Sequence, residues 1–271
     1  MEKAVDELST GGITPDVTCY LFTGEKWHQK TVNVPSEMAL TIFINSQEIA
    51  TILCTPTKLT HLVLGFLYSE GIIADMSDVA SLRVCEDEPI ADVRLTKTEY
   101  IPPSRRTLTS GCGSGVSFAN QASRVISDLV VTPEEVLSLM KQLYQQQNLF
   151  QLSGGIHSSA LCDRKQILVL AEDIGRHNTL DKIVGECLMG RMPTQGHILI
   201  TTGRISSEML LKAARMQTPI VVSRSSPTER AITLGRELGI TVIGYARGER
   251  LSVFSGEERL LNTGNQVKLG L

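Results

Sequence analysis

Along the first half of the chain, hydrophobic and polar residues mainly follow the two-residue period of β-strands, with one helical stretch between them. Two β-rich runs flank Asn45-Ser46, which predicts a hairpin. The apolar residues after Pro56 recur on one helical face until Gly71, which predicts a helix. The strands expected in this half lie at 38–44, 47–53, 81–85 and 90–95.

In the second half, short apolar runs alternate with amphipathic segments. This half opens on Thr132-Pro133-Glu134-Glu135, where a threonine cap, a proline in the first helical position and Glu135 predict the start of a helix. Further on, the expected strands lie at 167–171, 197–201, 220–222 and 241–245, and the expected helices at 176–189, 206–216 and 227–238. This alternation predicts an α/β domain with a mixed sheet covered by helices.

The change of pattern predicts two domains that meet near residue 128. We expect a smaller, strand-rich α+β domain at 1–128 and an α/β domain at 129–271. A net charge of −3 gives no basic surface for nucleic acid, and no apolar run approaches the length of a membrane span. Because the first residues also lack the pattern of a signal peptide, we expect a soluble cytoplasmic protein without nucleic-acid or membrane partners.

The cysteines are scattered, with no C-x-x-C pair and no cysteine–histidine cluster, so we expect neither a disulfide framework nor a metal site. They are Cys19, Cys54, Cys85, Cys112, Cys162 and Cys187. Cys54, Cys85 and Cys187 lie in apolar patterns and are expected to be buried. Cys112 stands between glycines and follows Arg105-Arg106, and nearby positive charge lowers the pKa of a thiol. This pattern is typical either of a reactive thiol on a swinging loop or of a residue tolerated in a disordered one.

Polar segments follow four of the predicted strands, at 172–177, 203–206, 223–227 and 245–250. In α/β sheets ligands gather at the carboxyl ends of strands, and helix N-termini attract anions. The residues expected to bind an anionic ligand from the first two segments are Arg176, His177, Arg204 and Ser206. The alternative interpretations are ordinary capped helices and, for 245–250, a polar hairpin that turns at Gly248.

Several of these segments together resemble the formate dehydrogenase accessory sulfurtransferase family, the FdhD/NarQ group. The matching stretches are Gly65–Ile73, Gly111–Gly113, Gly154–His157, Glu172–His177, Leu180–Lys182 and Gly203–Met209. They occur in order from about residue 35 to about residue 255, which makes the resemblance specific although each stretch alone is weak.

The resemblance implies a sulfur carrier that works through a cysteine persulfide. Such a protein accepts sulfur from a cysteine desulfurase and passes it to the molybdenum bis(molybdopterin guanine dinucleotide) cofactor of formate dehydrogenase. Cys112 matches the persulfide cysteine. The stretch that matches the guanine-dinucleotide site comprises Tyr245, Ala246, Arg247, Gly248, Glu249 and Arg250. The resemblance also implies a homodimer and, for the second domain, a cytidine-deaminase-like three-layer α/β/α fold.

The sequence departs from the family at one position, because Gly115 stands where many members have a second cysteine. A single thiol can still carry a persulfide, but sulfur release through a disulfide within this loop would need another cysteine, such as Cys162. A cofactor-binding chaperone without sulfur transfer is the alternative function. A deaminase is rejected because the chain lacks the H-x-E and P-C-x-x-C motifs that hold catalytic zinc.

Overall fold

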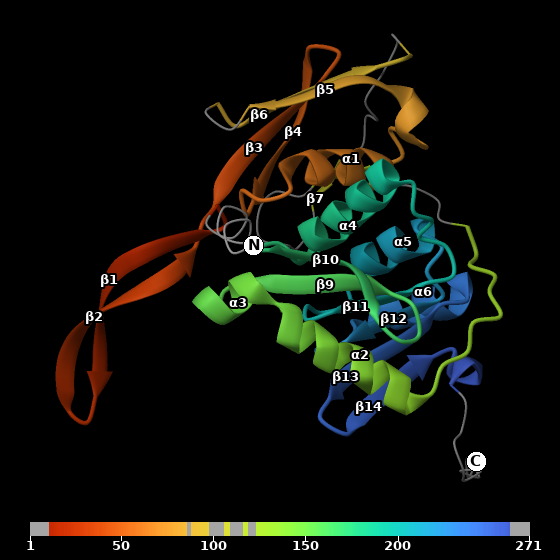
Figure 1. The fold of residues 1–271 in the computed structure, drawn as a ribbon. Coiled ribbons are helices and arrows are strands. Elements are labelled where there is room, and N and C mark those ends of the chain that lie inside the picture. Colours follow the sequence, from red (N-terminus) through yellow and green to blue (C-terminus); the bar gives the residue numbers. More distant parts are fainter. Residues whose placement is uncertain (1–10, 86–87, 98–105, 109–115, 119–122, 261–271) are drawn as a thin grey trace, which may run out of the picture. The chain divides into compact units, whose positions relative to one another are not determined.

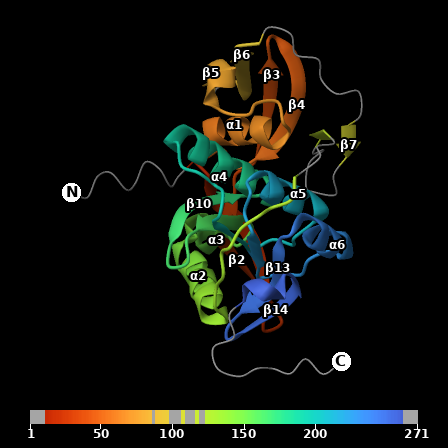
Figure 2. The same cartoon turned by 90° about the vertical axis from the view of Figure 1, so that its right-hand side faces the viewer.

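The computed structural model describes residues 11–85, 88–97, 106–108, 116–118 and 123–260 (Figure 1, and from the side in Figure 2). The chain forms two compact units, each built from three segments. The first unit contains Met1–Asn120, Gln146–Ser158 and Ala171–Met192; the second contains Gln121–Gln145, Ser159–Leu170 and Pro193–Leu271.

The first unit holds a four-stranded sheet of order β4-β3-β6-β5 and two separate two-stranded pairs, β1-β2 and β7-β8. Its elements are β1 (Ile13–Thr23), β2 (Lys26–Pro35), β3 (Met38–Ile44), β4 (Gln47–Cys54), α1 (Leu59–Ser69), η1 (Met76–Asp78), β5 (Val79–Cys85), β6 (Ile90–Leu95), β7 (Arg106–Leu108), β8 (Val116–Phe118), α3 (Asn148–Ser153) and α4 (Arg176–Gly190). Its main core lies between the four-stranded sheet and α1.

The hairpin predicted at Asn45-Ser46 is confirmed. Both residues have positive φ, 49° and 72°, as a two-residue turn of type I′ requires. Helix α1 begins at Leu59 rather than at Pro56. The residues before Leu59 form hydrogen bonds with a different helix: the Thr55 carbonyl and the Thr57 hydroxyl accept hydrogen bonds from a buried lysine of α4.

Helices α1 and α4 cross closely because each has a glycine at the contact. A Cβ atom at Gly65 would collide with the carbonyl oxygen of Asp181, and one at Gly185 with that of His61. Two helix backbones can approach this closely only where one of the facing residues lacks a side chain. Gly65, which opens one of the family-like stretches, therefore has a packing role.

The second unit is built on a six-stranded mixed sheet of order β10-β9-β11-β12-β13-β14. Its elements are α2 (Pro133–Gln146), β9 (His157–Cys162), β10 (Ile167–Asp173), β11 (Ile198–Thr201), α5 (Ser207–Arg215), β12 (Ile220–Ser223), α6 (Glu229–Leu238), β13 (Thr241–Arg247), β14 (Arg250–Ser255) and η2 (Glu257–Arg259). The central strands β11, β12 and β13 are parallel, whereas β9 pairs antiparallel with β11 and β14 pairs antiparallel with β13.

Helices cover both faces of this sheet. Strand residues such as Ile200 and Val222 share a core with Leu139 of α2. Since side chains alternate along a strand, Val242 points to the opposite face, where it lies against Gly235 of α6. The predicted mixed sheet with flanking helices is confirmed.

The compact units do not coincide with a single division near residue 128. Helices α3 and α4, with the adjoining ends of β9 and β10, belong to the first unit. The reason is packing, because α4 buries its apolar residues against α1.

One helix start also differs from the prediction: α6 begins at Glu229, capped by the Thr228 hydroxyl, and not at Pro227. Within the described part of the chain, no helix combines the length and hydropathy needed to cross a membrane.

Candidate functional site

Cys112, the predicted sulfur acceptor, lies outside the described residues, as does Arg105. The strands on either side, β7 and β8, pair antiparallel, with Leu108 opposite Val116. The predicted role of Cys112 therefore stays a prediction.

Three of the other cysteines are buried thiols. Burial, with the nearby Asp173 carboxylate as the next cause, raises the pKa of Cys54 to about 12. Burial followed by Glu186 raises the pKa of Cys187 to about 12, and burial followed by Asp163 raises the pKa of the Cys162 thiol. At neutral pH these groups stay protonated and are poor nucleophiles.

Cys162 is therefore a poor second thiol for releasing sulfur. It is fully buried within the apolar core of the second unit. Cys54 and Cys187 are buried as predicted, whereas Cys85 is half-buried, because β5 is an edge strand of its sheet. Cys19, on β1, is half-buried too.

The loops that follow β11, β12 and β13 lie together, as predicted from their places at the ends of parallel strands. The Ile205 amide donates to the Ser226 carbonyl (3.2 Å), and the Thr228 amide donates to the Ile205 carbonyl (2.9 Å). The Tyr245 amide donates to the Ser225 carbonyl (3.1 Å). These backbone hydrogen bonds fix the segments 203–206, 223–228 and 245 as one edge of the sheet.

At this edge, Arg204 is exposed and Ser206 has a structural task. The Ser206 hydroxyl caps α5 by accepting a hydrogen bond from the Met209 amide (3.3 Å). The capped-helix interpretation is thus correct for Ser206, and Arg204 remains available to a ligand.

A β-bulge at Tyr245 and Ala246 interrupts the pairing of β13 with β14. Tyr245 has a φ of 54°, which is uncommon for a residue with a side chain, and the register between β13 and β14 shifts at this point. As a result, Ala246 enters the core, whereas the Tyr245 ring remains 42% exposed and packs on Phe254 with ring centroids 6.2 Å apart. The Tyr245 ring therefore offers an exposed aromatic face at this edge of the sheet.

The turn after the bulge places two arginines side by side. Arg247 and Arg250 are direct partners across the hairpin, and Gly248 between them has a φ of 60°. Both arginines are exposed, and no acidic side chain of the described residues forms an ion pair with either one. Like charges opposite each other destabilise a hairpin, so an anion between them would stabilise this one.

A groove of about 720 Å³ lies between α2 and this turn. It is lined by Glu134, Leu137, Ser138, Met140, Lys141, Tyr144, Arg224, Ala246, Arg247, Gly248 and Glu249. Leu137, Met140 and Ala246 supply its apolar part. Each side brings charges of both signs, and the cations Lys141, Arg224 and Arg247 outnumber the carboxylates of Glu134 and Glu249. A volume of this size suits one nucleotide-sized ligand.

The groove includes part of the predicted set and adds residues that the sequence analysis did not single out. Among the predicted residues, the groove contains those from Ala246 to Glu249, whereas Tyr245, Arg250, Arg204 and Ser206 do not line it. Lys141 and Tyr144 were missed. The sequence did offer a signal, because Tyr144 is an aromatic residue outside the apolar face of a predicted amphipathic helix. The structure leaves Tyr144 57% exposed.

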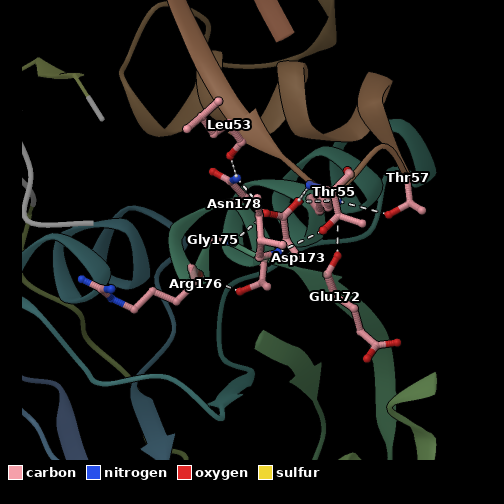
Figure 3. A network of polar contacts seen from close by, with 11 residues as sticks. Leu53, Thr55, Thr57, Glu172, Asp173, Gly175, Arg176 and Asn178 are labelled. Carbon is pink, nitrogen blue, oxygen red and sulfur yellow. Dashed lines mark hydrogen bonds and ion pairs between the residues drawn. The ribbon is translucent and has the colours of Figure 1, made fainter. Parts of the chain in front are cut away.

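The predicted segment 172–177 belongs to the first unit and has a structural role there (Figure 3). Asp173, which lies just before α4, forms a fully buried ion pair with Lys182, with 2.6 Å between Oδ2 and Nζ. Its oxygens also accept hydrogen bonds from the amides of Thr55 and Gly175 and from the side chain of Asn178. The residue at the cap position is Gly175, which has no side chain to donate or accept.

Glu172 and Lys182 extend this buried network. The Glu172 carboxylate accepts hydrogen bonds from the amides of Asn148, Leu149 and Phe150 at the start of α3. Lys182 donates to the carbonyls of Thr55 and Glu172 and to the Thr57 hydroxyl. The network therefore ties together segments that are far apart in the chain.

The two predicted ligand residues of this segment are less accessible than expected. Arg176 is buried and His177 half-buried. The Arg176 side chain extends away from Asp173 (Figure 3). Nearby, burial and then the positive charge of Arg176 lower the pKa of His157, although Asp173 opposes them. This segment has a clear structural role, and its binding role stays a prediction.

Comparison with known proteins agrees with the order of motifs along the chain. Residues 35–261 match the FdhD/NarQ family. The chain is 43% identical over 245 residues to the sulfur carrier protein FdhD of Halalkalibacterium halodurans, covering 87% of this chain and 91% of that protein. It is 39% identical over 233 residues to the sulfur carrier protein FdhD of Bacillus subtilis, covering 83% and 89%.

A solved structure has the same fold. The crystal structure of a proposed formate dehydrogenase accessory protein from Desulfotalea psychrophila superposes with a TM-score of 0.78 at 25% sequence identity. The match covers 92% of this chain and 100% of that one. Given the family match over most of the sequence and relatives near 40% identity, the chain belongs to the FdhD/NarQ family.

Proposed function

We propose that the protein is a sulfur carrier that holds sulfur as a persulfide on Cys112 and delivers it to the molybdenum bis(molybdopterin guanine dinucleotide) cofactor of formate dehydrogenase. The observation that carries this proposal is the identity to sulfur carrier proteins over about nine tenths of their length, with Cys112 inside the matched region. The high pKa values of Cys54 and Cys187 and the burial of Cys162 support it, because they leave few other candidate nucleophiles.

The first step is a thiol exchange with a cysteine desulfurase. The Cys112 thiolate attacks the terminal sulfur of the desulfurase persulfide and forms a new S–S bond. The S–S bond of the donor breaks, and the donor cysteine leaves as a thiolate that takes up a proton. Cys112 then carries the sulfur as a persulfide, with no net oxidation or reduction.

Release requires a second thiol. That thiol attacks the inner sulfur of the Cys112 persulfide and forms a disulfide with Cys112, while the terminal sulfur leaves as hydrosulfide for the cofactor. Position 115 is glycine and Cys162 is fully buried, so we propose that a low-molecular-weight thiol from solution supplies this group. A further thiol then reduces the disulfide and restores Cys112.

The groove of the second unit is the proposed docking place for one guanine nucleotide of the cofactor, which is here a substrate and not a resident group. A planar base suits the apolar part of the groove, with Tyr144 as an aromatic neighbour. The phosphates suit Lys141, Arg224 and Arg247. The opposed arginines Arg247 and Arg250 support this assignment, because an anion between them relieves their repulsion.

We keep the prediction that the second unit is similar in fold to cytidine deaminases. The mixed sheet with helices on both faces supports it.

Intact-protein mass spectrometry after incubation with a cysteine desulfurase and cysteine tests the carrier function. The wild type is expected to gain one sulfur atom, removable by reductant, and Cys112→Ala is expected to gain none. Cys85→Ala is the matched control, because this half-buried cysteine should be dispensable. Loading that persists in Cys112→Ala would contradict the assignment of the acceptor.

Calorimetric titration with GDP tests the nucleotide site separately. Tyr144→Ala is expected to weaken binding by about tenfold, which corresponds to the lower range of base–aromatic stacking. Leu152→Ala, an exposed residue of the first unit, is the control and should leave binding unchanged. Equal affinities of the two variants would remove the groove from the proposal without affecting the role of Cys112.

The alternative is a chaperone that binds the cofactor without transferring sulfur, and a groove with Lys141, Arg224 and Arg247 is compatible with it. The two functions predict different results when Cys112 is replaced. A chaperone should support formate dehydrogenase maturation with Cys112→Ser, whereas a carrier should not.

A further inference from the structure

The groove between α2 and the β13-β14 turn contains two carboxylates, although its proposed ligand is an anion. Glu134 comes from α2 and Glu249 from the turn, and Figure 1 shows this helix lying beside the β13-β14 hairpin. A carboxylate repels phosphate groups, so a site for phosphates alone would not need one. The mixed lining therefore indicates a ligand that offers N–H donors as well as phosphates.

The α2 wall of the groove changes its chemistry along the helix. Most of its groove residues recur every three or four positions and so lie on one helix face. Glu134 and Lys141 are two helical turns apart, which is about 10 Å along the helix axis. From the N-terminal end, the residues of this face are Glu134, Leu137, Ser138, Lys141 and Tyr144. The wall therefore has a hydrogen-bond acceptor at one end and a cation two turns further on, with the apolar Leu137 between them.

The two carboxylates of the groove are not equivalent. Glu249 belongs to the same short turn as Arg247, one of the cations expected to hold the phosphates. Its carboxylate is therefore at the phosphate end of the ligand. Glu134 is separated from Lys141 by about the length of a nucleoside, so it is placed to meet the base.

The start of α2 does not require Glu134 for its cap. The neighbouring Glu135 completes the cap, because its carboxylate accepts hydrogen bonds from the Thr132 amide (2.8 Å) and from the Arg164 side chain (2.8 Å). The exposed side chain of Glu134 lines the groove instead. The two adjacent glutamates thus have different surroundings, and only one of them can contact a ligand in the groove.

Guanine is the nucleic-acid base whose edge suits a carboxylate. Its N1–H and its 2-amino group are adjacent donors, and the two oxygens of an ionised carboxylate are acceptors only. Adenine has a ring nitrogen that accepts at the N1 position, and cytosine has one at N3. A carboxylate facing either base would therefore meet a lone pair and lose a hydrogen bond, which is how a polar site rejects a wrong ligand.

We propose that Glu134 is the specificity-determining residue of the groove and accepts hydrogen bonds from the N1–H and the 2-amino group of guanine. This inference rests on the proposed nucleotide site and adds the residue that distinguishes guanine from other bases. In this arrangement the base lies on Leu137, and the phosphates extend toward Lys141 and Arg247.

Calorimetric titration of the full chain with GDP, IDP and ADP tests the assignment. We expect the wild type to bind GDP about tenfold more tightly than ADP, which is within the range for one bidentate contact to a base. IDP, which lacks the 2-amino group, should bind with intermediate affinity. Glu134→Gln should reverse the preference, because an amide can accept from the 6-amino group of adenine and donate to its N1.

Glu249→Gln is the matched control, because it also removes one negative charge from the groove. It should tighten the binding of GDP and ADP by the same factor and keep the preference for GDP. Equal affinities of the wild type for GDP and ADP, or a GDP preference that survives in Glu134→Gln, would overturn the inference and leave the groove as a nucleotide site. If the wild type bound no nucleotide, the groove assignment would fail with it, whereas sulfur loading of Cys112 would be unaffected.

Discussion

The buried ion pair between Asp173 and Lys182 predicts a large loss of stability when the lysine is replaced. Lys182→Met keeps much of the side-chain volume but leaves the Asp173 carboxylate buried without its cation. Both side chains are fully buried, and their charged atoms are 2.6 Å apart. Breaking such a pair by removing one partner costs about 3–5 kcal/mol, which is a large part of the stability of a domain.

The first unit contains a second ion pair that serves as a control, because its charged atoms are equally close but its side chains are exposed. Lys58 and Glu186 also lie 2.6 Å apart, but their side chains are 38% and 36% exposed. Solvent screens such a pair, so Lys58→Met should cost less than about 1 kcal/mol. The comparison isolates burial as the cause, because substitution and ion-pair length are the same.

Urea unfolding followed by far-ultraviolet circular dichroism measures both variants. We expect a lower midpoint with an unchanged slope for Lys182→Met and a nearly unchanged midpoint for Lys58→Met. Adding Asp173→Asn to Lys182→Met should restore part of the loss, because the uncompensated charge is gone. If the two lysine variants lost the same small amount of stability, the structural role assigned to the 172–182 segment would be wrong.

Three further predictions concern packing, pH and ligand binding. Gly185→Ala should destabilise by about 1–3 kcal/mol, because its Cβ meets a carbonyl of α1, whereas Gly190→Ala in the same helix has open space and should be neutral in thermal unfolding. Burial lowers the pKa of His157, so the unfolded chain binds the extra proton, and stability should fall as the pH drops below about 6.5. His157→Gln should flatten that dependence in unfolding curves at several pH values, and an unchanged slope would count against it. Replacing Arg247 and Arg250 by alanine should weaken GDP binding at least about tenfold while stabilising the hairpin slightly; unchanged affinity in calorimetry would refute the first part.

The features predicted correctly from the sequence depend on residues that are close together in the chain. The Thr132 hydroxyl accepts from the Glu135 amide, and the Glu135 carboxylate accepts from the Thr132 amide, as the four-residue capping pattern predicted. The turn at Asn45-Ser46 follows in the same way from its place between two β-rich runs, with asparagine as a residue that tolerates positive φ. The alternation of apolar runs with amphipathic segments likewise predicted parallel strands. It therefore also predicted that the loops after these strands lie together at one edge of the sheet.

The features missed depend on partners that are distant in the chain. Asp173 has the local pattern of a helix cap, but its partners include Thr55, more than a hundred residues away. Short elements also escaped: α3 has six residues and too few apolar positions to set a period. The β1-β2 ribbon was missed because most of its side chains are exposed, so burial imposes little alternation on it.

The sequence by itself determined the alternation of strands and helices in the second half and the main caps and turns, because these rest on local spacing. It also indicated the family, through motifs that occur in order along most of the chain. Only the tertiary structure decided that Asp173 pairs with Lys182, that Gly65 and Gly185 bring two helices together, and that Lys141 lies across a groove from Arg247. These features arise from long-range packing, where burial fixes which charges must pair and which backbones can touch. Local periodicity specifies which face of an element is apolar, but it does not specify which distant segment covers that face.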